Sequence, residues 1–168
     1  YSEYLKEKYH EKVYKLPINL PITCPNRLNG NGCSFCAEVG TGFEAIESCV
    51  PVREQIDRTR TLIQKKYKAK KYIAYFQSFT NTYAPIERLK RLFYEAIKPD
   101  YIVGINIGTR PDCLLNDVIE LLKEINKIKP VTVELGLQTS NDEVAVYINR
   151  GYKSEVYKNA VSRLKAAG

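Results

Sequence analysis

Three of the chain's five cysteines lie close together, at Cys24, Cys33 and Cys36. The last two form a C-x2-C pair, which brings two sulfur atoms within reach of one metal centre because the two intervening residues fold into a tight turn. The spacer before Cys33 is rich in Gly and Asn, which accept the left-handed backbone angles that such a loop needs. Structural zinc is normally closed by four protein ligands, so three thiolates indicate a metal centre with one open position.

A structural zinc site is the alternative for this cysteine cluster. Its fourth ligand would be Cys49, just before Pro51, or His10, the only histidine of the chain. Both residues also have an ordinary interpretation, as a small buried hydrophobe and a solvated helix position. A zinc site of this kind would suit a non-catalytic RNA-binding module, and the cysteines by themselves leave both metals open.

Five motifs, in order, resemble the radical S-adenosylmethionine (SAM) superfamily, and within it the YhcC/YtqA-type proteins, relatives of the catalytic subunit of Elongator. The motifs are CPNR at 24–27, Phe35 before the last cysteine, QSFTNTYAP at 77–85, GTRPDC at 108–113 and ELGLQ at 134–138. The superfamily usually spaces its cysteines C-x3-C-x2-C, so the first spacer here is longer. The resemblance covers nearly the whole chain and implies that Cys24, Cys33 and Cys36 hold a [4Fe-4S] cluster whose fourth iron binds SAM.

The same resemblance implies which side chains contact SAM. Gln77 and Ser78 stand where many members have Gly-Gly-Glu, so side-chain hydrogen bonds would replace a close approach of the backbone. Gln138 would hydrogen-bond the SAM ribose. Arg150, twelve residues on, would bind the SAM carboxylate, for which a planar guanidinium is well suited.

Polar residues at the ends of two other predicted strands complete the candidate site. Thr109 follows the third strand, and the nearby Arg110–Asp112 pair either orders the loop or binds a ligand. Glu134 lies inside an otherwise apolar strand, where a carboxylate is unfavourable unless it is paired or faces a cavity. We therefore expect Glu134 to point into the fold, toward cofactor or substrate.

The hydrophobic pattern predicts a scaffold that would bring these motifs together. Strand, loop and helix alternate four times, which favours parallel strands joined by right-handed crossovers. No G-x-G-x-x-G follows the first strand, and the polar motifs all follow strands, which favours a βα-barrel over a dinucleotide-binding sheet. The predicted fold is thus α/β, a partial (βα) barrel of radical SAM type with about four βα repeats. Strands are predicted at 15–23, 72–76, 101–107 and 131–137, and helices at 2–12, 52–67, 86–97, 116–128, 142–148 and 154–167.

The length of 168 residues suits one domain, so we expect a single radical SAM core domain over 1–168. A complete eight-repeat barrel takes about 250 residues, and the core that the chain resembles has six repeats. We therefore expect the N-terminal part of a core whose barrel is incomplete at the C-terminus. The lack of any Met agrees with a fragment.

The composition fits a globular cytoplasmic protein, with 44% hydrophobic and 27% charged residues and an odd number of clustered cysteines. No apolar run approaches the ~20 residues of a membrane span, so no membrane partner is expected. The net charge of +7 permits a polyanionic partner such as RNA.

The resemblance implies an enzyme that cleaves SAM reductively to a 5′-deoxyadenosyl radical. It also implies a one-electron reductant such as flavodoxin or ferredoxin, and a tRNA substrate modified at its wobble uridine.

Overall fold

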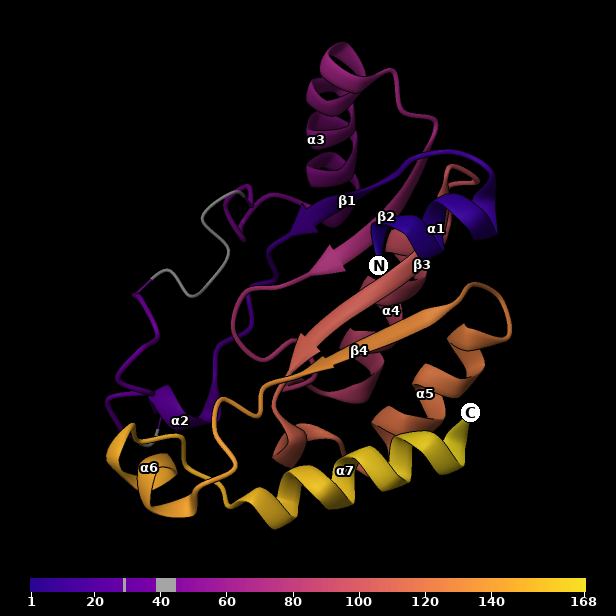
Figure 1. The fold of residues 1–168 in the computed structure, drawn as a ribbon. Helices are drawn as coiled ribbons and strands as arrows, with labels where there is room; N and C mark the ends of the chain where they lie inside the picture. Colours follow the sequence, from indigo (N-terminus) through magenta and orange to yellow (C-terminus); the bar gives the residue numbers. More distant parts are fainter. Residues whose placement is uncertain (29, 39–44) are drawn as a thin grey trace.

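Four parallel strands form one sheet in the computed structural model, which describes residues 1–28, 30–38 and 45–168 (Figure 1). The strands are β1 (Val13–Ile18), β2 (Lys71–Phe76), β3 (Ile102–Thr109) and β4 (Val131–Leu135). They lie in the sheet in the order in which they occur in the chain. A doubly wound sheet reverses its strand order at a switch point, and this sheet does not. The prediction of a partial βα barrel is therefore confirmed.

Helices cover one face of this sheet. They are α3 (Val52–Tyr67), α4 (Ile86–Ile97) and α5 (Asn116–Asn126), each of which connects two successive strands. In α4 the apolar residues recur at helical spacing and are buried, as Leu89, Phe93 and Ala96 show. The last helix, α7 (Ser154–Ala167), packs beside α5 (Figure 1).

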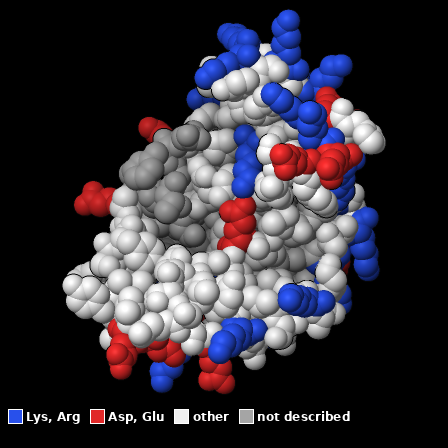
Figure 2. Space-filling model, viewed as in Figure 1, with Lys and Arg blue, Asp and Glu red and all other residues white. Residues whose placement is uncertain are grey.

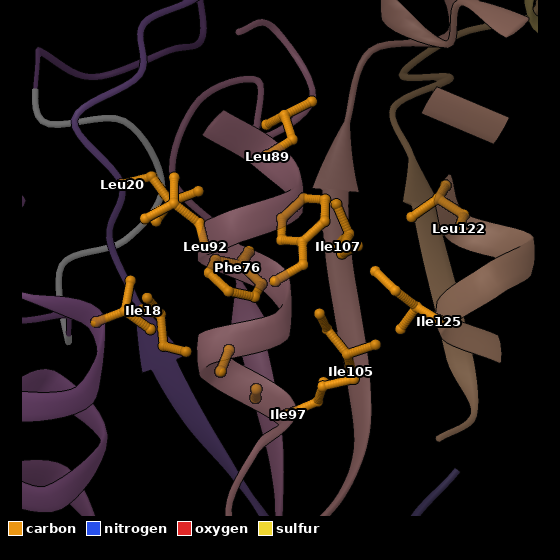
Figure 3. Packing of buried hydrophobic residues seen from close by; sticks show 14 of the residues in the cluster. Ile18, Leu20, Phe76, Leu89, Leu92, Ile97, Ile105, Ile107, Leu122 and Ile125 are labelled. Carbon is orange, nitrogen blue, oxygen red and sulfur yellow. The ribbon is translucent and has the colours of Figure 1, made fainter. Parts of the chain in front are cut away.

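The hydrophobic core lies between the sheet and these helices, on what we call the outer face of the sheet (Figure 3). Ile105 and Ile107 alternate along β3 with residues of the opposite face, and both are fully buried. Phe76 of β2 packs against Phe93, with ring centroids 5.2 Å apart. This packing fixes the four strands relative to one another.

The opposite, inner face is closed at the amino ends of the strands by α1 (Ser2–Tyr9). The Tyr9 hydroxyl donates to the Val103 carbonyl oxygen at 2.9 Å, and the Tyr1 hydroxyl donates to Asn106 Oδ1 at 3.2 Å. The remaining part of the inner face, toward the carboxyl ends, is left for the candidate site.

Two predicted boundaries at the start of the chain were wrong. The helix predicted over 2–12 ends at Tyr9, because His10 adopts a left-handed backbone conformation with φ 56°. The strand predicted over 15–23 ends at Ile18. At the next residue, the side chain of Gln55 bonds both backbone groups of Asn19. Its Oε1 accepts from the Asn19 N–H and its Nε2 donates to the Asn19 carbonyl oxygen, each at 2.9 Å, so that the chain leaves the sheet.

Two short helices were not predicted, and a third was predicted slightly too long. The missed ones are α2 (Pro25–Leu28) and the 3-10 helix η1 (Pro111–Cys113), and both start at a proline, whose fixed φ suits a first helical position. The third, α6 (Asp142–Tyr147), begins after Asn141, whose side chain accepts from two backbone N–H groups. Among the described residues, no helix combines the length and the apolar character needed to cross a bilayer.

Candidate metal and cofactor site

A hollow of about 320 Å³ lies at the carboxyl ends of the strands and brings together segments that are far apart in the sequence. Three thiols from the loop after β1 share it with polar residues that follow β2, β3 and β4. Of the predicted site residues, it is lined by Cys24, Cys33, Cys36, Gln77, Thr109, Glu134, Gln138 and Arg150. Ser78 is not part of this lining, and its side chain is buried.

Local backbone hydrogen bonds hold the cysteine loop in two turns. The carbonyl oxygen of Cys24 accepts from the N–H groups of Arg27 and Leu28, at 2.9 and 3.3 Å, which forms α2. The N–H of Cys36 donates to the carbonyl oxygen of Cys33 at 3.0 Å. The C-x2-C segment is therefore the tight turn that its spacing predicts.

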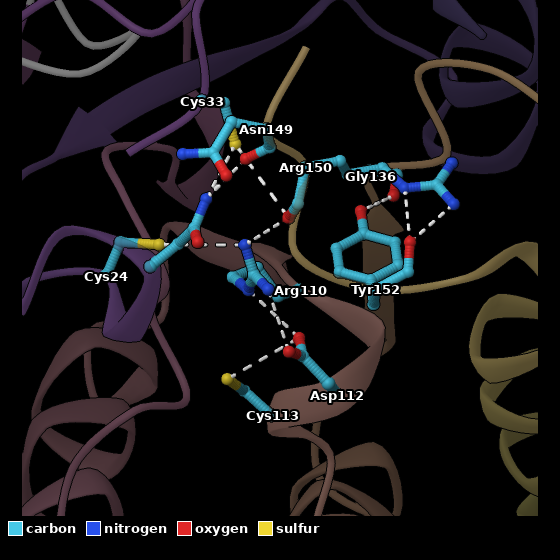
Figure 4. Close-up of polar contacts among 10 residues, drawn as sticks. Cys24, Cys33, Arg110, Asp112, Cys113, Gly136, Asn149, Arg150 and Tyr152 are labelled. Carbon is cyan, nitrogen blue, oxygen red and sulfur yellow. Dashed lines mark hydrogen bonds and ion pairs between the residues drawn. The ribbon is translucent and has the colours of Figure 1, made fainter. Parts of the chain in front are cut away.

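A turn from a distant part of the chain clamps this loop (Figure 4). Asn149 follows α6 and donates its side-chain amide to the Gly32 carbonyl oxygen at 2.6 Å. Asn26 in α2 donates back to the Asn149 carbonyl oxygen at 2.7 Å. Gly151 has φ +83°, and a Cβ there would lie 2.8 Å from Asn26 Oδ1. The close packing of α2 against this turn therefore requires glycine at 151.

Two N–H donors approach the sulfur atoms. Asn26 Nδ2 lies 3.3 Å from Cys33 Sγ, and Arg110 Nη1 lies 4.0 Å from Cys24 Sγ. Burial raises the pKa of Cys33 by more than Asn26 and Arg110 lower it, so the metal-free protein favours the neutral thiol. A bound metal would deprotonate it, and the two donors would then face thiolates.

The predicted pair of Arg110 and Asp112 is present. Arg110 donates from Nε and Nη2 to the two carboxylate oxygens of Asp112, at 2.9 and 2.8 Å, in a bidentate arrangement. Its Nη1 also donates to the Arg150 backbone carbonyl oxygen at 2.9 Å, and its guanidinium lies over the Tyr152 ring. Only 11% of the Arg110 side chain is exposed. The pair orders the loop and also turns a cation toward the sulfurs.

Arg150 has a different environment from the one that we expected. Its side chain is 0% exposed, and all five of its N–H donors are directed at protein acceptors. These are the carbonyl oxygens of Leu137, Thr139 and Tyr152 and the carboxylate of Asp142. Arg150 thus ties the loop after β4 to the segment after α6, and the expected contact with the SAM carboxylate would require this network to open.

Glu134 is both paired and at the edge of the hollow, the two conditions under which we expected a carboxylate in this strand. It accepts hydrogen bonds from Lys15 Nζ at 2.9 Å, Tyr75 Oη at 2.8 Å and Asn106 Nδ2 at 3.1 Å, one from each of the other three strands. Burial would raise the pKa of Glu134, but these three donors lower it overall. Burial and Glu134 together raise the pKa of Tyr75 to about 12. The carboxylate therefore stays ionised and the phenol stays neutral.

Thr109 and Gln138 are also constrained by their neighbours. The Thr82 hydroxyl donates to the Cys113 carbonyl oxygen at 2.7 Å, so the 2.6 Å contact between Thr82 and Thr109 leaves Thr109 as the donor. Its oxygen can then only accept from a ligand. Gln138 has φ 61°, and its side chain folds back over Gly136, where a Cβ would lie only 2.9 Å from Gln138 Nε2.

Thr80 and Asn26 were missed as site residues. The Thr80 side chain is 1% exposed and lines the hollow, and its hydroxyl has no hydrogen-bond partner within the described part of the chain. A buried polar group in this state is unfavourable unless something else satisfies it. Both residues could have been found from their motifs, because Asn26 lies in CPNR and Thr80 lies in QSFTNTYAP.

Neither predicted fourth ligand for zinc joins the cysteines. Cys49 is exposed, does not line the hollow and lies with its sulfur 3.7 Å from the Glu47 carboxylate. His10 follows α1, at the opposite end of the strands. Within the described ranges, no group of three or more His, Cys, Asp or Glu residues could hold a single metal ion.

The donor chemistry of the residues that line the hollow suits a thiolate-bound cofactor. Three thiols line a single hollow, N–H donors face two of the sulfurs, and the orphaned hydroxyl of Thr80 opens onto the same space. Thiolate sulfur is the ligand that iron–sulfur clusters use, and hydrogen bonds to those sulfurs are a usual part of such sites.

Comparison with known proteins identifies the family. The family model of the radical SAM superfamily matches residues 18–168. The chain is 39% identical to YtqA of Bacillus subtilis (strain 168) over 168 residues, 98% of this chain and 52% of that protein. It is 35% identical to MJ0486 of Methanocaldococcus jannaschii, over 90% of this chain and 48% of that protein, and 34% identical to YhcC of Escherichia coli (strain K12), over 98% and 53%.

A solved structure supports the fold. The archaeal Methanocaldococcus infernus Elp3 with an N-terminal deletion of residues 1–46 superimposes with a TM-score of 0.59 and 16% sequence identity, over 88% of this chain and 34% of that chain. This chain spans about half of the length of the relatives named above. It resembles YtqA and YhcC as its motifs predict, and it belongs to the radical SAM superfamily.

Proposed function

We propose that Cys24, Cys33 and Cys36 hold a [4Fe-4S] cluster and that SAM binds beside it in the hollow. The observation that carries this proposal is that the three thiols and the loops after β2, β3 and β4 line one space. When bound, the cluster and SAM would supply a 5′-deoxyadenosyl radical through reductive cleavage, for hydrogen abstraction from a substrate.

The chain's own residues would bind and orient SAM. Gln77, Thr80 and Gln138 offer polar groups from the loops after β2 and β4. Thr80 is the strongest candidate for a direct contact, because its buried hydroxyl gains a partner when a polar ligand binds. The ring of Phe79 lines the same hollow and would help to exclude water from it.

The proposed reaction needs one electron from outside, and we propose a small redox protein of the flavodoxin or ferredoxin type as its donor. Half of the Phe35 side chain is exposed beside two of the cysteines, so this edge of the hollow is open to a docking partner. We expect the protein to work in the cytoplasm, where thiols stay reduced.

We propose tRNA as the substrate, modified at a wobble uridine, on the resemblance to relatives of the Elongator catalytic subunit. Charge supports an RNA partner. Residues 52–71 hold eight Lys or Arg and two Asp or Glu, so this segment carries six of the seven net positive charges. Figure 2 shows Lys and Arg side chains gathered over the end of the molecule that α3 occupies. This basic surface would bind phosphates, and RNA binding should weaken steeply as salt rises.

Anaerobic reconstitution with iron and sulfide tests the central proposal. The protein should turn brown, contain iron and sulfide in equal amounts, and release 5′-deoxyadenosine from SAM when reduced. Colourless protein that holds one tightly bound zinc and still binds RNA would contradict the proposal and support a non-catalytic RNA-binding module.

A further inference from the structure

Arg110 occupies a position that the SAM-binding motifs do not account for. Its guanidinium lies within hydrogen-bonding reach of a cysteine sulfur, with Nη1 at 4.0 Å from Cys24 Sγ. The other arginine of the hollow, Arg150, directs all of its N–H donors at protein oxygens. Arg27 directs its N–H donors at backbone carbonyl oxygens of the cysteine loop, so the positive charge directed at a cysteine sulfur is that of Arg110, at Cys24.

The surroundings of Arg110 hold this charge in place. Asp112 binds two of its nitrogens, the Arg150 carbonyl oxygen binds the third, and Tyr152 lies under the guanidinium plane at 4.8 Å. An arginine guanidinium is protonated at any ordinary pH, and Asp112 forms an ion pair with it at 2.8 Å. The side chain therefore remains a fixed, fully charged donor.

We infer that Arg110 sets the reduction potential of the cluster, as a positioning and electrostatic residue and not as a ligand. This inference rests on the proposed function, because it needs a cluster on Cys24, Cys33 and Cys36. Reduction adds one negative charge to the cluster. A buried cation and an N–H directed at a cluster sulfur stabilise that added charge, and both raise the potential.

Asn26 provides a neutral counterpart within the same site. Its amide N–H lies 3.3 Å from Cys33 Sγ, closer than Arg110 is to Cys24, but it carries a dipole and no net charge. A charge acts over a longer distance than a dipole in a partly buried site, so Arg110 should affect the potential more strongly. Asp112 is the opposing charge, because its carboxylate partly offsets the field of Arg110 at the sulfurs.

The test is a spectroscopic redox titration of the reconstituted protein, which does not depend on turnover. Arg110→Gln should bind the same amount of iron and sulfide and shift the midpoint potential to a more negative value. Arg110→Lys keeps the charge and should restore most of the shift. Asp112→Asn removes the opposing charge and should shift the potential in the positive direction. Arg53→Gln, on the exposed surface of α3, makes the same change in net charge outside the hollow and should leave the potential unchanged.

The possible outcomes separate this inference from the proposed function. If the unaltered protein assembles no cluster, the proposed function and the inference both fail. If the cluster assembles and Arg110→Gln has the potential of the unaltered protein, or a more positive one, the inference alone fails. If Arg110→Gln loses its cluster, the potentials of Arg110→Lys and Asp112→Asn test the inference instead. An Asp112→Asn variant whose midpoint potential does not rise overturns the inference.

Discussion

The outer and inner faces of the sheet are built from the same four strands and differ completely in chemistry. On the outer face, Ile105, Ile107 and Phe76 are fully buried against helices. On the inner face, the side chains of Lys15, Tyr75 and Asn106 surround the partly exposed carboxylate of Glu134. Successive side chains along a strand point to opposite faces, so the same strands supply the apolar residues of the outer face and the polar residues of the inner face.

This difference separates stability from chemistry. The outer face contributes apolar burial, which is the main stabilising term in folding. The inner face and the loops beyond it contribute charged and polar groups whose partners are mostly one another. We therefore expect substitutions on the two faces to affect different quantities. Those on the outer face should change the free energy of unfolding, and those at the site should change cofactor binding.

The largest effect is expected for Cys36→Ala. The variant should lose the visible absorption of the reconstituted protein completely, because two thiolates cannot hold the cluster. The free energy of unfolding of the metal-free protein should change little, since the Cys36 side chain is only partly buried. Iron analysis and urea unfolding measure the two quantities. Cys49→Ala is the matched control, and it should keep both, because Cys49 lies outside the hollow.

Ile105→Ala should lower stability and leave cluster binding unchanged. It removes a fully buried side chain from the outer face and should lower the free energy of unfolding by about 2–5 kcal/mol. Cluster content per folded molecule should stay close to that of the unaltered protein. Urea unfolding followed by circular dichroism measures the loss. A variant that keeps its stability and loses its cluster would contradict the division between the two faces.

Gly151→Ala should affect both stability and cofactor binding, because the packing of Gly151 against Asn26 holds the cysteine loop and is also part of the fold. An alanine would have to adopt φ +83°, a strained region that raises the energy by about 1–3 kcal/mol, and its Cβ would collide with Asn26. We expect a moderate loss of stability together with reduced cluster loading. Gly30→Ala, where a Cβ would meet only the Asn26 carbonyl oxygen at an ordinary 3.5 Å, is the control for an added methyl group in the same region.

The sequence predicts the repeating part of the fold well. The strands and helices from Val52 onward follow the apolar pattern closely, and the polar motifs fall at the carboxyl ends of the strands as expected. That Glu134 is paired and lies at a cavity could be predicted, because an ionised group in an apolar strand has few stable solutions. That Cys24, Cys33 and Cys36 lie along one hollow could be predicted, because their spacing limits the geometry of the loop.

Features set by long-range contacts were beyond the sequence. The hydrogen-bond network around Arg150 could not be predicted, because its partners lie in loops whose conformation no local pattern gives. The first strand ends early because of Gln55, 36 residues from its partner Asn19. Thr80 stands out only once its burial and its lack of a described partner are known. Such side chains gain their roles from tertiary packing.

The smallest expected effects are those of substitutions in the polar cluster of the inner face, beginning with Glu134→Gln. The pKa of Glu134 is lowered in the folded protein, so its contribution to stability is present above the ordinary carboxyl pKa of about 4.3 and is lost as the pH falls through the lowered value. Since 37% of the side chain is exposed, this contribution should stay below about 1 kcal/mol at neutral pH. Urea unfolding at pH 7 and at pH 3 should show the variant and the unaltered protein differing less at the lower pH.

Tyr75→Phe sharpens this last prediction, because it removes one donor to Glu134 and leaves the carboxylate charge and Lys15 in place. At pH 7, Tyr75→Phe should lower the free energy of unfolding by as much as Glu134→Gln or less. At pH 3, the variant and the unaltered protein should again differ less than at pH 7. Losses of several kcal/mol in either variant would mean that the inner face also holds the strands together. The polar cluster would then be part of the fold, and the two faces would differ in chemistry but not in task.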